Sequence, residues 1–206
     1  MTALGRTRSR AVSTPTRRRT RDPDRKDRIL EAAADLVARS GFHAVGMTDI
    51  GGAVGVTGSA IYRHFDSKSA VLVALFDGVI DQLLADAREI AHRRVDPAIA
   101  LRELIAGQVE LVVGQRQLAQ VYHNEIHNLP AEDRRRLRRK QRLYLEEWVH
   151  LLSELRPDLA DVDTRVLVHA AIGAIQSVLF HQGGLPDDRQ RVLLDEAARA
   201  ILAAPR

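Results

Sequence analysis

Apolar residues recur every three or four positions along most of this 206-residue chain, and turn-forming residues separate the runs. That spacing is the period of an amphipathic helix. The first clear run consists of Ile29, Leu30, Ala33, Leu36 and Val37, and Gly41 follows as an expected helix end. No segment keeps the strict alternation of apolar and polar residues that is typical of a half-buried strand. The pattern therefore predicts an all-α protein.

Nine helices are predicted from these runs and from the residues between them. Thr48, Thr57 and Ser67 are good N-cap residues for the second, third and fourth helices. Asp96 supplies a cap for the fifth, and a proline follows it at the first helical position. The expected helices cover about residues 24–40, 48–54, 57–64, 67–91, 97–113, 116–127, 131–155, 163–182 and 187–202.

The composition narrows the class of protein. Hydrophobic residues make up 45% and charged residues 28% of the chain, as in an ordinary globular protein. The lack of cysteine excludes disulfides and cysteine-bound zinc. No apolar run approaches the length of a membrane span, and the N-terminus lacks the apolar segment of a secretory signal. We therefore expect a cytoplasmic protein with no membrane partner.

The positive charge is concentrated near the N-terminus. Residues 1–28 contain ten Lys or Arg and three Asp, an excess of +7, so the rest of the chain contributes −3 to the total of +4. Residues 1–22 also lack apolar periodicity and are predicted to form a disordered basic arm. Such an arm either adds nonspecific affinity for nucleic acid or only keeps the protein in solution, and charge alone does not separate these alternatives.

Residues 23–68 are expected to form one small domain. Its three predicted helices describe a helix-turn-helix unit, in which the two short helices are joined at Gly55, a residue that suits the left-handed position after a helix. The expected core consists of Ile29, Ala33, Leu36, Ile50, Ala53, Val56, Ile61 and Phe65. The start of the third helix then faces outward, and a recognition helix presents this end to the DNA major groove.

The segment from residue 25 to residue 70 resembles the DNA-binding domain of the TetR family of bacterial transcriptional regulators. The resemblance rests on a helix that ends in Gly41-Phe42, on "MTDI" and on "GVTGSAIYRHFDSK". The nine-helix layout is also similar to that family. The resemblance implies a ligand-responsive regulator, which we expect to be a repressor. It would bind a pseudo-palindromic double-stranded DNA operator as a homodimer, and a small effector in the C-terminal domain would release it.

The resemblance also implies DNA contacts, position by position. Phosphate contacts are implied for Thr48, Thr57, Tyr62, His64 and Lys68. Base-facing positions are implied for Ser59, Ala60 and Arg63, while Gly58 lets the backbone approach the duplex. Ser59 departs from the family, which more often has glycine there. Gly51 and Gly52 are further departures, because a glycine inside a helix costs about 0.8–1 kcal/mol relative to alanine.

Residues 69–206 are expected to form a ligand-binding and dimerisation domain. The last two helices have stripes that can bury a partner's copy, and the expected interface residues are Ala170, Gly173, Ala174, Leu193, Ala197 and Ile201. Such a dimer can place two recognition helices about one DNA turn apart. The candidate ligand-binding residues mix apolar and polar types: Tyr122, Glu125, Ile126, Tyr144, Trp148, Ile172, Gln176 and Phe180. Ordinary core packing is the alternative for most of them.

An acyl-CoA is the candidate effector. "VYHNEIHNLP" followed by "RRRLRRKQRLYLEEWV" resembles the ligand domain of TetR-type regulators that respond to acyl-CoA thioesters. Arginines at 134–142 could then bind CoA phosphates, although a solvated charged helix face is the alternative. His123 and His127 have a spacing that can ligate a metal. However, no third ligand is evident, so neither a metal nor another cofactor is predicted.

Two other classes of function remain as alternatives. A thioester-processing enzyme has little support, because the sequence lacks a glycine-rich phosphate loop, a nucleophile elbow and paired catalytic carboxylates. We therefore predict that the protein is not an enzyme. A nonspecific architectural DNA-binding protein that uses the basic arm is the second alternative, and competition with random DNA would distinguish it from an operator-specific protein.

Overall fold

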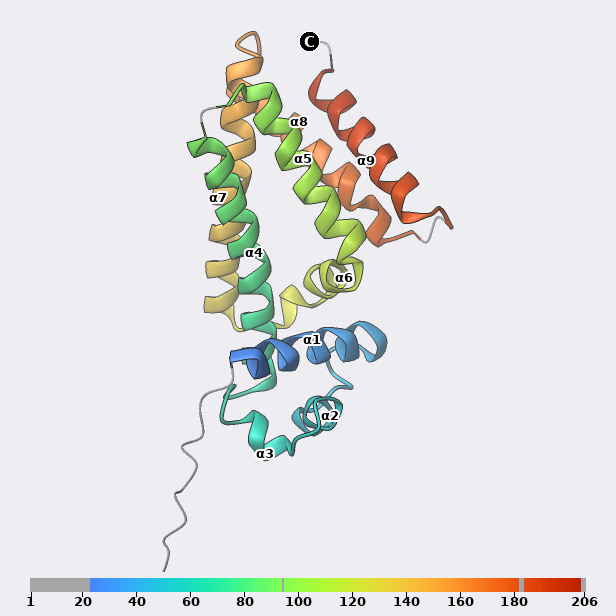
Figure 1. The fold of residues 1–206 in the computed structure, drawn as a ribbon. Coiled ribbons are helices and arrows are strands. Elements are labelled where there is room, and N and C mark those ends of the chain that lie inside the picture. Colours follow the sequence, from blue (N-terminus) through green and yellow to red (C-terminus); the bar gives the residue numbers. More distant parts are fainter. Residues whose placement is uncertain (1–22, 94, 182–183, 205–206) are drawn as a thin grey trace, which may run out of the picture.

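The computed structural model describes residues 23–93, 95–181 and 184–204, so the predicted basic arm lies outside the described residues. These ranges form nine α-helices and two short 3₁₀-helices and contain no strand, as the sequence predicts. In chain order they are α1 (Pro23–Ser40), α2 (Met47–Ala53), α3 (Gly58–Ile61), α4 (Lys68–His92), α5 (Pro97–Gly114), α6 (Arg116–Glu125), η1 (Ile126–Asn128), α7 (Ala131–Leu155), α8 (Asp161–Gln176), η2 (Ser177–Leu179) and α9 (Asp187–Leu202). The corner formed by α2 and α3 and the C-terminal end of α9 lie at opposite ends of the molecule (Figure 1).

Helix α1 forms because its apolar residues fall on one face. Ile29, Ala33 and Val37 follow at intervals of four, and each is at most 4% exposed. Gly41 ends the helix in a left-handed conformation with φ of +78°, and its N–H bonds to the Val37 carbonyl at 2.8 Å. A residue with a side chain is strained at this φ, so the glycine fixes where the chain turns.

The start of α2 differs from the prediction. Thr48 is not its N-cap, because the helix begins at Met47 and Gly46 is the cap residue. The Gly46 N–H donates to the Asp49 carboxylate at 2.7 Å. A side chain of the first turn therefore satisfies the N–H of the cap residue, which fixes the start of the helix at Gly46 although no side chain caps it.

Helix α3 is shorter than predicted. Thr57 is its N-cap residue, as expected, but the helix ends at Ile61 and residues 62–64 form a turn. Gly55 has a φ of +71°, which agrees with the left-handed position assigned to it from the sequence. Most of the predicted core around this corner is buried or half-buried, but Ala53 is exposed.

Two glycines allow α2 and α3 to approach closely. A Cβ added to Gly51 would lie 2.8 Å from the Val56 carbonyl oxygen, and one added to Gly58 would lie 3.0 Å from the Thr48 hydroxyl oxygen. Packing therefore explains the unusual glycine at position 51. Gly52 is different, because a Cβ there would meet nothing within 4 Å.

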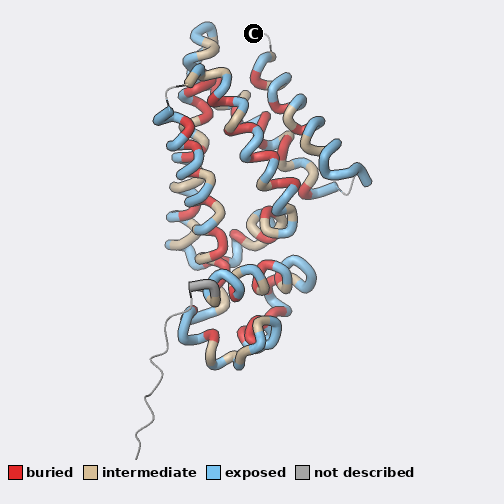
Figure 2. Tube along the Cα trace, in the orientation of Figure 1, coloured by how far each residue is buried: buried red, intermediate tan, exposed pale blue. Residues whose placement is uncertain are grey.

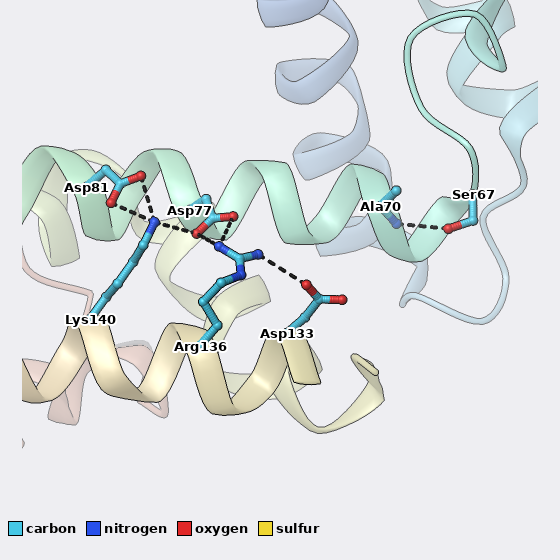
Figure 3. Close-up of polar contacts among 7 residues, drawn as sticks. All are labelled: Ser67, Ala70, Asp77, Asp81, Asp133, Arg136 and Lys140. Atoms are coloured by element: carbon cyan, nitrogen blue, oxygen red, sulfur yellow. Dashed lines mark hydrogen bonds and ion pairs between the residues drawn. The ribbon is translucent and has the colours of Figure 1, made fainter. Parts of the chain in front are cut away.

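Helix α4 connects the two halves of the molecule. Ser67 caps it, as predicted, by accepting a hydrogen bond from the Ala70 N–H at 3.0 Å (Figure 3). Its first buried residues, including Leu72 and Phe76, belong to the core around α1, α2 and α3. Leu84 and later buried residues belong to the core of the C-terminal bundle. Because packed cores transmit strain, a tilt of α4 affects both.

The C-terminal bundle consists of α5, α7, α8 and α9 together with the second half of α4 (Figure 1). Buried residues follow the inward faces of these helices, and exposed residues follow the outward faces (Figure 2). Helices α8 and α9 lie against each other. They contribute Ala171, Ile175, Leu194 and Ala198 to the common core.

One described segment, Asp161–Leu179, is apolar and long enough to meet a simple criterion for a membrane-spanning helix, with a mean hydropathy of 1.2. The expectation that no apolar run approaches this length is therefore too strong. The segment is α8 with η2, and Val168, Ala171 and Ile175 on it are buried in the bundle core. Packing within the bundle accounts for these apolar residues without a membrane.

Candidate DNA-binding surface and ligand cavity

The corner formed by α2 and α3 lies at one end of the molecule (Figure 1). Tyr62 is 55% exposed, and Arg63 and His64 next to it are also exposed. These three residues are consecutive in the turn after α3, so the phenol of Tyr62, the guanidinium of Arg63 and the imidazole of His64 are all exposed there. Such groups can hydrogen-bond DNA phosphates, and an arginine can also read a guanine edge.

Hydroxyl groups stand at the start of α3. The Thr57 and Ser59 hydroxyl oxygens lie 2.9 Å apart and share a hydrogen bond, and both residues are exposed. Thr48, at the start of α2, is exposed as well, whereas Gly58 and Ala60 are half-buried. Eight of the nine predicted DNA-contact residues thus lie on α2, on α3 or in the residues next to α3. Lys68 is the exception, because it begins α4 and its side chain bonds to the loop after α1.

Lys68 bonds to the loop between α1 and α2. Its Nζ donates to the Phe42 carbonyl at 2.6 Å and lies 4.3 Å from the centre of the Phe42 ring. A weaker contact of 3.4 Å joins it to the His43 carbonyl. This arrangement ties the first residue of α4 to the end of α1. A phosphate contact from Lys68 remains a prediction, and it would have to compete with these bonds.

A residue of the C-terminal domain also bonds to this loop between α1 and α2. The Phe42 N–H donates to the Glu125 carboxylate at 3.3 Å, and the other carboxylate oxygen accepts from Asn128 at 2.6 Å. Glu125 is the last residue of α6. The sequence suggested this residue as a ligand contact, but its carboxylate instead links the ligand domain to the DNA-binding domain.

A cavity of about 90 Å³ lies in the bundle between α4, α5, α6, α7 and α8. Tyr122, Tyr144, Ile172 and Gln176, which are four of the eight predicted ligand residues, line this cavity. Sequence reasoning missed most of the other lining residues, namely Val79, Ile80, Leu83, Gln108, Leu111, Val112, Ala119, His123, Gln141, Leu145 and Leu179. Gln108 is the most informative of these, because a glutamine that is only 3% exposed is unusual in a bundle core.

The other four predicted ligand residues lie outside the cavity lining. Glu125 bonds to the DNA-binding domain, as described above. Ile126 belongs to the core shared with α1, and Trp148 is fully buried next to Tyr144. Phe180 is 56% exposed and stacks edge-on against His123 at 4.6 Å. None of the four lines this cavity, so a ligand contact from any of them remains a prediction.

The two cavity tyrosines have hydroxyl groups without a hydrogen-bond partner in this structure. Burial raises the pKa of Tyr122 to about 12, although the nearby charge of Arg138 opposes this shift. Burial also raises the pKa of Tyr144. Both side chains therefore stay protonated at neutral pH and offer hydrogen-bond donors to the cavity. Tyr122 packs edge-on against Phe76 with 4.9 Å between ring centres, so it touches the core around α1 as well.

The arginine run on α7 does not act as one cluster. Arg136 and Lys140 bond to Asp77 on α4 at 2.6 and 2.7 Å (Figure 3). Burial alone would raise the pKa of Asp77, but these bonds outweigh it and hold the pKa below its usual range. Arg139 lines an open groove whose walls are formed by α4 and α7 alone. Arg138 is different, because its charge acts on Tyr122 and opposes the rise of that pKa.

The outward faces of α8 and α9 expose apolar residues. Val162 is 69% and Val166 is 61% exposed on α8, and Val192 and Leu193 on α9 are 45% and 37% exposed. The predicted dimer residues lie on these same two helices. Ala170, Gly173, Leu193 and Ala197 are exposed, while Ala174 and Ile201 are half-buried. Two adjacent helices with such a face resemble half of a larger apolar interface.

The two histidines whose spacing could ligate a metal do not form a larger cluster in the described residues. His123 lines the cavity and contacts Phe180, and His127 is exposed on η1. Within the part of the chain that the structure describes, no group of three or more His, Cys, Asp or Glu side chains is arranged to hold a metal ion.

A recognition corner at one end and a cavity within a helical bundle, joined by α4, define a helix-turn-helix regulator with a separate ligand-binding domain. Two family comparisons agree with this class. Residues 29–75 match the family "Bacterial regulatory proteins, tetR family", and residues 94–184 match "Tetracyclin repressor-like, C-terminal domain". The chain belongs to the TetR family of transcriptional regulators, which are not enzymes.

Individual relatives give more detail. The chain is 30% identical to the transcriptional repressor KstR2 of Mycobacterium tuberculosis over 152 residues, which is 68% of this chain and 72% of that protein. It is also 30% identical to KstR2 of Rhodococcus jostii, but over only 53% of this chain and about half, 54%, of that protein. Among solved structures, a TetR-family regulator from Bordetella parapertussis has a TM-score of 0.79 at 25% identity, with 89% and 96% of the two chains covered. The regulator FadR of Bacillus subtilis, solved with stearoyl-CoA, has a TM-score of 0.70 at 19% identity, with 87% and 99% covered.

Proposed function

We propose that this protein is a cytoplasmic repressor that binds a pseudo-palindromic operator as a homodimer and leaves it when an acyl-CoA thioester occupies the cavity. The observation that carries the proposal is the position of Tyr122. Tyr122 lines the cavity, and its ring packs on Phe76, which is fully buried in the core that supports α1. A ligand that moves this ring therefore acts on the packing of the DNA-binding domain.

The small size of the cavity explains how ligand binding would change the protein's conformation. Ligand sites usually have about 300–1,000 Å³, and the cavity here has about 90 Å³. An acyl chain must therefore separate α4 from α7 or α6 to enter. The ligand then binds the widened arrangement better than the closed one, and this differential affinity is what a conformational switch requires.

Two contacts can transmit the movement to the DNA-binding domain. The first is the packing of Tyr122 on Phe76 of α4. The second is the bond from the Phe42 N–H to the Glu125 carboxylate at the end of α6. Displacement of α4 or α6 would tilt the α2–α3 corner in each protomer. Half-sites one helical turn apart tolerate little change in the separation of the recognition helices, so operator affinity falls.

The dimer is proposed on the exposed apolar face of α8 and α9. Val162 and Val166 continue along α8 into Ala170 and Gly173, and Leu193 continues along α9 into Ala197. A two-fold contact through this face would bury these residues in a four-helix arrangement. Such isologous interfaces are the commonest in homodimers.

The choice of an acyl-CoA is supported by the apolar cavity and by Arg138 beside Tyr122. The FadR structure with stearoyl-CoA adds support as a relative in fold. Arg138 on the Tyr122 side could bind a CoA phosphate, whereas Arg139 lies in the outer groove. The two arginines are adjacent in sequence, so they form a matched test pair.

The experiment measures binding of the full-length protein to DNA from upstream of its own gene, in competition with random DNA, while acyl-CoAs or the corresponding free acids are added. We expect thioesters to lower operator affinity about 5–150-fold, the usual range of allosteric coupling. Arg138→Gln should weaken this response, and Arg139→Gln should leave it intact. A response to free acids that equals the response to thioesters, or equal effects of the two substitutions, would rule out the CoA assignment.

A further inference from the structure

Three buried polar atoms of the bundle have no hydrogen-bond partner in this structure: the hydroxyl oxygens of Tyr122 and Tyr144 and the indole Nε1 of Trp148. More than nine in ten buried polar groups in proteins are paired, so three exceptions at one location require an explanation. An indole N–H can only donate, and a protonated phenol has one donor. The group therefore offers donors that no acceptor among the described residues satisfies in this structure.

Tyr144 and Trp148 act as a pair. They lie one helical turn apart on α7, and their rings meet edge-on with 6.1 Å between centres. Tyr144 is 4% exposed and Trp148 is fully buried. The indole N–H is near enough to the phenol oxygen to favour its charged form, although burial dominates and raises the pKa of Tyr144. A small adjustment would let the indole donate to the phenol oxygen, which leaves the phenol O–H free to donate into the cavity.

The remaining lining does not satisfy these donors. Most of it is aliphatic, and its three glutamines, Gln108, Gln141 and Gln176, make no hydrogen bond to either tyrosine hydroxyl here. Tyr122 differs from Tyr144 because it is only half-buried and lies near the charge of Arg138. The cavity thus has a polar end at Tyr122 and a more deeply buried donor at Tyr144.

We infer that the effector carries a hydrogen-bond acceptor oxygen, a ketone or a hydroxyl, within its buried apolar part, and that Tyr144 supported by Trp148 donates to it. The inference rests on the proposed function only in taking this cavity as the effector site. It deepens that proposal, because a plain saturated acyl chain would leave the Tyr144 donor as unpaired as it is in the free protein, whereas an acceptor oxygen would pair it. The Tyr122 end then receives the thioester and the CoA.

The experiment is calorimetric titration of the full-length protein, without DNA, with two sets of ligands. One set contains a saturated medium-chain acyl-CoA and the same chain with a ketone at its middle or at its end. The other set contains the corresponding free acids. We expect the better ketone to bind about tenfold more tightly than the saturated chain, as one added hydrogen bond in a buried site allows. Tyr144→Phe removes only the hydroxyl, and it should bring the ketone and the saturated chain to within about twofold of each other.

A second measurement separates a ligand-binding hydroxyl from a structural one. Because the Tyr144 O–H has no acceptor in the free protein, and its oxygen lies near only a weakly placed indole N–H of Trp148, Tyr144→Phe should change the melting temperature by about 2 °C at most. A fall of several degrees would mean that the hydroxyl is already bonded in the free protein, and this would overturn the inference.

The comparison of thioesters with free acids distinguishes failure of this inference from failure of the proposed function. Tight binding of thioesters without any preference for the ketone, or a preference that persists in Tyr144→Phe, overturns the inference and leaves the acyl-CoA assignment intact. A ketone preference that depends on Tyr144 but is equally strong among free acids supports the inference and refutes the thioester requirement. If no ligand of either set binds, both are refuted.

Discussion

The close contact between α2 and α3 predicts opposite effects for alanine at two neighbouring glycines. In Gly51→Ala, the new Cβ would lie 2.8 Å from the Val56 carbonyl oxygen and 3.0 Å from the Gly58 nitrogen. Both neighbours are backbone atoms, and Val56 is itself bonded through its N–H to the Gly51 carbonyl at 2.8 Å. Neither can move without shifting α3. In Gly52→Ala, the Cβ enters open space.

The magnitudes follow from helix propensity and packing. Alanine in place of a helical glycine gains about 0.8–1 kcal/mol, and overpacking in a tight contact costs about 1–3 kcal/mol. Gly51→Ala should therefore lower the free energy of unfolding by up to about 2 kcal/mol, with a loss of up to about 8 °C in melting temperature for a chain of this size. Gly52→Ala lies near the end of α2 and should raise stability by about 0.5–1 kcal/mol.

The assay is thermal unfolding of both variants at the same protomer concentration, because dimer formation makes the midpoint depend on concentration. Operator binding should fall in Gly51→Ala, since α3 must move relative to α2. Circular dichroism would show that both variants are still helical. If Gly51→Ala is as stable as Gly52→Ala, the close contact between the two helices does not exist and the packing argument for Gly51 is refuted.

The remaining predictions concern DNA binding, assembly and pH. Tyr62→Ala should weaken operator binding without changing stability, as judged by electrophoretic mobility shift and thermal unfolding. Arg63→Ala should cost about 1–3 kcal/mol at one base pair per half-site if it reads a guanine, and a uniform loss across operator variants would make it a phosphate contact instead. Ala197→Glu should give monomers in sedimentation and weak operator binding, because a buried unpaired charge is costly; persistent dimers would place the interface elsewhere. Asp77→Asn should destabilise the protein at neutral pH by about 1 kcal/mol, within the range of partly exposed ion pairs. Because the pKa of Asp77 is lowered from 3.8 in the folded protein, its contribution is present above about pH 4 and is lost as the pH falls through the lowered value. The difference from wild type, measured by urea unfolding, should therefore disappear in strong acid, and a difference that persists there would not come from this charge.

The helices and their ends were mostly predictable because local chemistry decides them. Gly41 and Gly55 adopt the left-handed conformations that the sequence suggests, and Ser67 caps α4 with its hydroxyl. The cap of α2 was not predictable from Thr48, because the helix begins one residue earlier, where the Gly46 N–H bonds to the Asp49 side chain. The length of α3 was also missed, since the Arg63 and His64 N–H groups bond three residues back, to Ala60 and Ile61, and form a turn in place of a further α-helical turn.

The cavity was harder to predict than the fold. Tyr144 and Trp148 are close in sequence and similar in type, but only Tyr144 lines the cavity. Glu125 looked like a polar ligand contact, and its actual partner is Phe42, which lies 83 positions away in the chain. Contacts between distant segments decide which side of a helix faces a cavity. Helical spacing alone shows which residues share a face, but not what that face meets.

The central claim is that the cavity and the DNA-binding corner are energetically coupled. Coupling of two binding sites is reciprocal, so a ligand that weakens operator binding must itself bind more weakly to the operator complex, by the same factor. The most direct measurement is the affinity of one acyl-CoA for the free protein and for the protein saturated with operator DNA. We predict affinities that differ about 5–150-fold, equal to the loss of operator affinity caused by the same ligand. Equal affinities for the free protein and the operator complex would contradict the account.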